Sequence, residues 1–195
     1  MKFLFKVSGL IDALNSRIGQ GIKWIVFVVA LLSAGNAVAR RVFSVGSTGL
    51  VELQWYLFAL LFLIGGGYAF LRNVHVRVDF VSSRLTARAR SWIDIIGIIF
   101  FLAPFCVLLI QLSWPLFIKA LVTGEMSSNA GGLIRWPVFL LVPLGMALLL
   151  LQSASELVKR IAFLRGLIPD PLAHSQPAKD SPVTEQVNVE PAEDK

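Results

Sequence analysis

Three side chains that can carry charge alternate in one short polar stretch, His75-Val76-Arg77-Val78-Asp79. In an extended segment alternate side chains point to the same side, so the imidazole, the guanidinium and the carboxylate would act together. They could form a local Arg–Asp pair that anchors the segment at a membrane surface, or they could dock against a neighbouring protein. The residue types leave both interpretations open.

Two further carboxylates begin apolar segments. Glu52 follows Arg40 and Arg41 closely, which suggests either a local ion pair or a contact with another subunit. One turn later comes Tyr56. Asp94 begins a later segment, where we expect a local structural pair. Its candidate partners at the same membrane level are Arg72, Arg88 and Arg90.

Signatures of catalysis and metal binding are missing from the sequence. It contains no Gly-rich phosphate loop, no His-Glu-x-x-His and no Gly-x-Ser-x-Gly. Cys106 is the only cysteine, and His75 and His174 are far apart, so neither residue type suggests a metal cluster. We therefore expect no enzyme and no catalytic, metal or cofactor-binding residue.

The elements that position these groups are four apolar segments, at about 22–42, 51–71, 92–114 and 136–157. Each has the ~20 residues that a helix needs to cross a ~30 Å hydrocarbon core. The chain of 195 residues is 56% hydrophobic and its mean hydropathy is +0.73. We predict an all-α integral membrane protein, with a kink at Pro104 in the third span. The central thirds of the spans hold no Asp, Glu, Lys or Arg, which argues against ion translocation by this chain alone.

The flanks of the membrane domain, residues 1–167, have their own patterns. Residues 3–18 place apolar side chains at helical spacing, which predicts an amphipathic helix in the headgroup layer, jointed at Gly19–Gly21. A direct continuation of the first span fits the pattern equally well. Residues 168–195 are rich in proline and acids and predict a disordered tail.

Basic residues set the expected orientation. Twelve lie in the N-terminal segment, the second connection and the C-terminal flank: Lys2, Lys6, Arg17, Lys23, Arg72, Arg77, Arg84, Arg88, Arg90, Lys159, Arg160 and Arg165. Four lie in the first and third connections: Arg40, Arg41, Lys119 and Arg135. The positive-inside rule therefore places both termini in the cytoplasm. The basic charge flanks apolar spans, so we expect it to meet membrane lipids and not nucleic acid.

Over about residues 20–160 the sequence resembles the DctQ family, the small membrane subunits of tripartite ATP-independent periplasmic (TRAP) transporters. The resemblance rests on four spans, a Gly65–Gly67 step and charged or aromatic positions: Glu52, Tyr56, His75, Arg77, Asp79 and Asp94. Later features resemble the branch whose members handle organic acids: Glu125, Ser127, Gly131-Gly132-Leu133 and Trp136-Pro137.

The resemblance implies a multi-pass protein of the bacterial inner membrane. Its partners would be a large, many-spanning subunit and a periplasmic substrate-binding protein, and it would serve as a fixed scaffold in carboxylate uptake driven by a sodium or proton gradient. The six positions above are then candidates for contacts with partners or lipid. Two alternatives are a four-helix membrane anchor of a redox enzyme and a small self-assembling channel. The anchor would need a second histidine near a span, and the channel usually needs an acid in mid-span.

Overall fold

The computed structural model describes residues 2–43, 47–72, 86–129 and 131–169. These ranges are almost entirely helical. The helices are α1 (Lys2–Phe43), α2 (Thr48–Leu71), α4 (Ala87–Gly97), the π-helical turn η1 (Ile98–Leu102), α5 (Ala103–Thr123) and α6 (Trp136–Leu164). Four continuous helical stretches are long and apolar enough to cross a membrane: 3–43, 48–71, 87–123 and 136–164. The four predicted spans are thus confirmed.

The first span is much longer than predicted. Its 42 residues form one helix, which at 1.5 Å per residue is about 63 Å long, roughly twice the hydrocarbon thickness. Of the two alternatives for residues 3–18, the joint at Gly19–Gly21 is wrong and the direct continuation of the first span agrees with the structure, because the helix runs through these glycines. A helical glycine costs only about 0.5–1 kcal/mol relative to alanine. Gly19 also has a packing role, since a Cβ there would lie 2.2 Å from the Tyr68 ring.

The third span contains an irregular turn where the sequence predicted a kink. The π-helical turn η1 ends two residues before Pro104, which is the second residue of α5. The span does not end near Trp114, as we expected, because Pro115 lies within α5. A proline removes one helical hydrogen bond and bends a helix without always ending it. The helix ends at Gly124, whose φ of 61° is left-handed.

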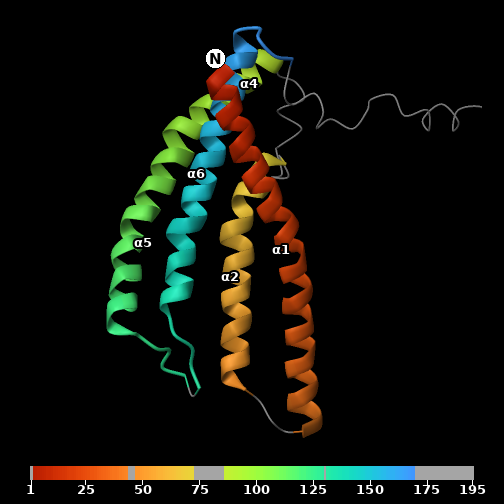
Figure 1. Cartoon of the computed structure of the whole chain (residues 1–195), viewed down its shortest axis with the longest axis vertical. Helices are drawn as coiled ribbons and strands as arrows, with labels where there is room; N and C mark the ends of the chain where they lie inside the picture. The colour runs from red at the N-terminus through yellow and green to blue at the C-terminus, as the bar shows by residue number, and fades with distance from the viewer. Residues whose placement is uncertain (1, 44–46, 73–85, 130, 170–195) are drawn as a thin grey trace, which may run out of the picture.

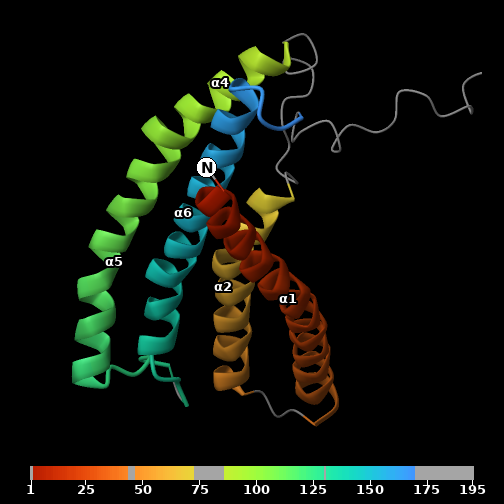
Figure 2. The same cartoon turned by 45° about the horizontal axis from the view of Figure 1, so that its top comes forward.

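The four spans lie side by side in a layer one helix thick, in the order α5, α6, α2, α1 (Figure 1). The N-terminal part of α1 also crosses toward α6, as the turned view shows (Figure 2). Two glycines allow this close packing. A Cβ on Gly145 would lie 2.6 Å from the Leu63 carbonyl oxygen, and one on Gly67 would lie 2.4 Å from Asn15 Oδ1. Helix α6 therefore contacts each of the other three spans.

Candidate functional site

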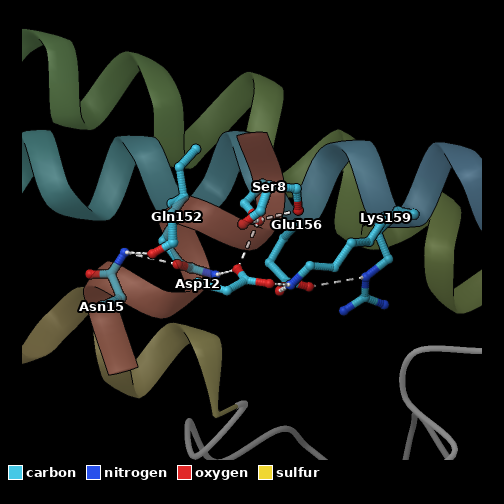
Figure 3. A network of polar contacts seen from close by, with 9 residues as sticks. Ser8, Asp12, Asn15, Gln152, Glu156 and Lys159 are labelled. Carbon is cyan, nitrogen blue, oxygen red and sulfur yellow. Dashed lines mark hydrogen bonds and ion pairs between the residues drawn. The ribbon is translucent and has the colours of Figure 1, made fainter. Parts of the chain in front are cut away.

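Polar side chains gather where the start of α1 crosses the end of α6 (Figure 3). We call this group the inner cluster. It consists of Ser8, Asp12 and Asn15 of α1, Gln152, Ser155, Glu156, Lys159 and Arg160 of α6, and Asp94 of α4. Spacings of three and four residues place each helix's members on one face. Both helices extend beyond a ~20-residue span, which puts the cluster near one membrane surface.

Hydrogen bonds join α1 to α6 within the inner cluster. Asn15 Nδ2 donates to Gln152 Oε1 at 2.8 Å, and Gln152 Nε2 donates to Asp12 Oδ1 at 2.9 Å. Ser155 Oγ donates to the same Asp12 oxygen at 2.8 Å and lies 2.6 Å from Ser8 Oγ. Four of these residues are buried, namely Ser8, Asn15, Gln152 and Ser155. The polar face of the N-terminal helix is therefore directed into the protein.

Charged groups continue the inner cluster toward α4. Lys159 Nζ lies 2.7 Å from Asp12 Oδ2 and 2.7 Å from Glu156 Oε1. Arg160 Nη1 lies 2.5 Å from Asp94 Oδ2, and its Nε lies 3.9 Å from Glu156 Oε2. Acids and bases thus alternate from α1 through α6 to α4. Each charge has an opposite charge beside it, an arrangement that suits a structural clamp better than a proton-transfer site.

A second polar cluster lies at the opposite end of the layer, and we call it the outer clamp. Glu52 of α2 accepts hydrogen bonds from the Leu133 backbone N–H at 2.7 Å and from Asn129 Nδ2 at 3.1 Å. Both donors belong to the connection between α5 and α6. This connection is closed by a bridge between Met126 and Ile134. One carboxylate thus fixes the third connection to the start of α2.

The outer clamp is reinforced by close backbone packing and by an ion pair. A Cβ on Gly49 would lie 2.8 Å from the Gly131 carbonyl oxygen, so glycine lets the connection approach α2. Arg135 and Glu125 form a half-exposed ion pair at 2.8 Å. The Gly132 position is also tight, since a Cβ there would lie 2.7 Å from the Ser127 carbonyl oxygen. The described part of the connection is therefore packed closely, both internally and against the start of α2.

Three of the six candidate contact residues, Glu52, Tyr56 and Asp94, lie in the part of the chain that the structure describes. Glu52 does not form the expected ion pair with Arg40 or Arg41, because both its oxygens are bonded to the third connection. Tyr56 lies one turn further along α2 and is partly buried. Asp94 pairs with Arg160, a partner we had not considered. His75, Arg77 and Asp79 lie outside the described residues.

Most of the inner cluster was missed by the sequence analysis. The signal was present, since Ser8, Asp12 and Asn15 recur at helical spacing, as do Gln152, Glu156 and Lys159. We had assigned such polar positions to water or headgroups. In the structure they face each other, while Phe3 and Leu10 of the same α1 segment are 75% and 65% exposed.

Comparisons with known proteins agree with the membrane architecture. A family model described as "Tripartite ATP-independent periplasmic transporters, DctQ component" matches residues 24–163. This range includes all of α2, α4, α5 and most of α6, and it therefore contains the outer clamp and the α4–α6 half of the inner cluster. Comparison with curated proteins and with solved structures found no match.

Proposed function

Because this chain belongs to the DctQ family, the small membrane component of TRAP transporters, we propose that it is the static scaffold partner of a large, elevator-type membrane subunit. Family membership makes it a multi-pass transporter component, and its matched range includes three of the four long helices in full or nearly so. TRAP systems are tripartite, so a large membrane subunit and a periplasmic binding protein are the implied partners.

The observation that carries the proposal is the pair of clamps at the two ends of a single helical layer. A static subunit must keep its helices in fixed positions while a neighbour moves. The inner cluster ties α1, α6 and α4 together, and the outer clamp ties α2 to the connection before α6. Paired charges and hydrogen-bonded groups of this kind resist rearrangement, because breaking one contact leaves a charge without its partner.

The shape of the layer supports a partner that does the transport. A solute pathway needs walls on all sides, whereas one layer of helices supplies a single wall (Figure 1). Large apolar side chains are exposed along the layer, among them Phe62, Phe100, Phe101 and Val122. In a membrane these meet either lipid tails or the helices of another subunit. The polar groups of the inner cluster and the outer clamp, by contrast, are engaged within the chain.

The finer features of the proposal follow the resemblance and the charge distribution. The system imports organic acids with a cation gradient, and both termini of this subunit face the cytoplasm. The start of α1 lies at the cytoplasmic headgroup layer, with its exposed Phe3 and Leu10 in contact with lipid or the large subunit. We include His75, Arg77 and Asp79, which lie outside the described residues, among the proposed contacts with the large subunit and call this stretch the partner-facing corner.

Co-purification and reconstitution test this proposal together. The chain should be recovered from its native membrane in mild detergent with a near-stoichiometric, many-spanning partner. Proteoliposomes holding both membrane subunits should take up solute only when the binding protein is added. The chain alone should give none. Uptake by the purified chain alone, or its recovery as a homo-oligomer without the large subunit, would contradict the scaffold role.

A further inference from the structure

A groove lies between α1 and α2 near the ends that the first connection joins. It has a volume of about 500 Å³ and is lined mainly by Ser33, Asn36, Arg40, Arg41 and Gln54. Four of these come from α1 and Gln54 comes from α2. The groove is open to the side of the layer, at the end opposite to the inner cluster.

Two amide groups in this groove each have one atom without a hydrogen-bond partner among the residues that the structure describes. Asn36 is only 7% exposed, and its Oδ1 has no hydrogen-bond partner in the described part of the chain. Gln54 Nε2 is buried and equally without a partner among the described residues. Buried polar atoms are nearly always satisfied in folded proteins, because leaving one unsatisfied costs free energy. A molecule that occupies the groove and presents polar atoms would satisfy both.

Two arginines line the same groove, closer to the end of α1 than Asn36 is. Arg40 and Arg41 are exposed, and neither forms an ion pair with a described residue, since the nearby Glu52 is bonded to the third connection. In the proposed topology they lie on the outer side of the membrane, against the usual distribution of basic residues. Guanidinium groups bind phosphate oxygens with paired, charge-assisted hydrogen bonds. The unpaired positive charge therefore favours an anion.

We propose that this groove binds an anionic phospholipid of the outer leaflet, such as phosphatidylglycerol, with its phosphate at Arg40 and Arg41. Asn36 precedes Arg40 by one helical turn, about 5.4 Å deeper in the membrane. That depth suits the ester carbonyls, which follow the phosphate in a phospholipid. Gln54 Nε2 donates to an ester carbonyl, and so does the Asn36 amide after a half-turn that exchanges its oxygen and nitrogen.

The groove offers two levels of contact, the arginines near its outer end and the amides of Asn36 and Gln54 deeper in the membrane. Different occupants would use these levels differently. Free phosphate would use the arginines but leave the deeper amides unsatisfied. A zwitterionic phospholipid would satisfy the amides but gain less from two positive charges. An anionic phospholipid uses both levels, which is why the observations favour it. The assignment to the outer leaflet rests on the proposed function and its topology, whereas the groove itself does not.

The test is native mass spectrometry of the full chain, purified with its large subunit in mild detergent and titrated with phosphatidylglycerol or phosphatidylethanolamine. The wild type should bind phosphatidylglycerol more tightly, and inorganic phosphate should not displace it. Arg40→Gln/Arg41→Gln should weaken phosphatidylglycerol binding by about tenfold and remove the preference. Asn36→Leu should weaken both lipids similarly. The controls Arg17→Gln and Arg165→Gln change exposed arginines at the other end of the layer and should bind like the wild type.

Three outcomes would overturn the proposal. Equal lipid binding in the wild type and the double arginine variant would show that the groove is not the site. Displacement by inorganic phosphate would indicate a free-anion site, and loss of the large subunit with lipid binding unchanged would indicate a protein interface. If the large subunit is never recovered, the scaffold role fails, but the same titration on the chain in detergent still tests the lipid site.

Discussion

Lys159 of α6 lies 2.7 Å from Asp12 of α1, so an ion pair connects the last helix to the beginning of the chain. The same ammonium group is 2.7 Å from Glu156, and Asp12 also accepts two hydrogen bonds from α6. The long helix α1 is thereby held across α6 and α2 in the single-layer arrangement.

Substitutions of Asp12 should separate its two roles. Asp12→Asn keeps an oxygen for Gln152 and Ser155 but loses the ion pair, whereas Asp12→Ala loses both. We expect Asp12→Ala to lower stability by about 1–3 kcal/mol and Asp12→Asn to lower it less. Thermal unfolding of the detergent-solubilised protein measures the difference. Arg17→Gln, an exposed change on the same helix, is the control, and an Asp12→Ala melting curve that matches this control would contradict the clamp.

The pair formed by Arg160 and Asp94 should show strong coupling. Removing either partner by Arg160→Met or Asp94→Leu leaves the other largely buried charge uncompensated, which typically costs about 3–5 kcal/mol. The double variant should lose much less than the sum of the two single variants. A double-mutant cycle on unfolding in detergent measures this coupling. Additive losses would mean that the two side chains do not support each other.

Neighbouring glycines in α2 should respond in opposite ways. Gly67→Ala places a methyl group 2.4 Å from Asn15 Oδ1 and 3.4 Å from the Leu148 carbonyl oxygen, so it should destabilise the packing of α1 and α6 on α2. Gly66→Ala meets nothing within 4 Å and should be neutral or stabilising by up to about 1 kcal/mol. Melting temperatures of the two variants provide a matched comparison. Equal effects would show that Gly67 is not a contact point.

Glu52 should control the conformation of the third connection. Glu52→Gln removes the charge and leaves one acceptor oxygen for two donors, the Leu133 N–H and Asn129 Nδ2, so the hydrogen bonds of the outer clamp weaken. Hydrogen exchange at Leu133 should therefore become at least about tenfold faster. Glu125→Gln breaks only the half-exposed pair with Arg135 and should change this rate little. Unaltered Leu133 exchange in Glu52→Gln would show that another contact fixes the connection.

The polar stretch after α2 should matter for assembly. Arg77→Ala or Asp79→Ala should lower the yield of complex with the large subunit, or solute uptake, because both belong to the proposed partner-facing corner. Quantitative co-purification and uptake measure the two effects. Arg88→Ala changes an exposed arginine at the start of α4 and serves as the control. Normal yield and normal uptake in both variants would assign the stretch no part in assembly.

The sequence by itself determined that there are four spans, where each lies along the chain, and the family. Hydrophobic runs of about 20 residues are a local property that needs no knowledge of packing. The glycine step at Gly65–Gly67 also indicated close helix contacts, and Gly67 makes one. Glycine and proline predicted the span ends poorly. Helix α1 continues through Gly19–Gly21, and α5 continues through Pro115, although the sequence suggested a joint at the first position and a span end at the second.

Only the tertiary structure decided which polar groups meet. Ser8, Asp12 and Asn15 show a helical polar face, yet a face alone does not tell whether water, headgroups or another helix lies against it. Glu52 is near Arg40 and Arg41 in sequence but bonds to Asn129 and Leu133, which are far away along the chain. Pairing depends on how helices cross, and the crossing is set by close contacts such as Gly145 on Leu63. These contacts join residues distant in sequence, so no local pattern specifies them.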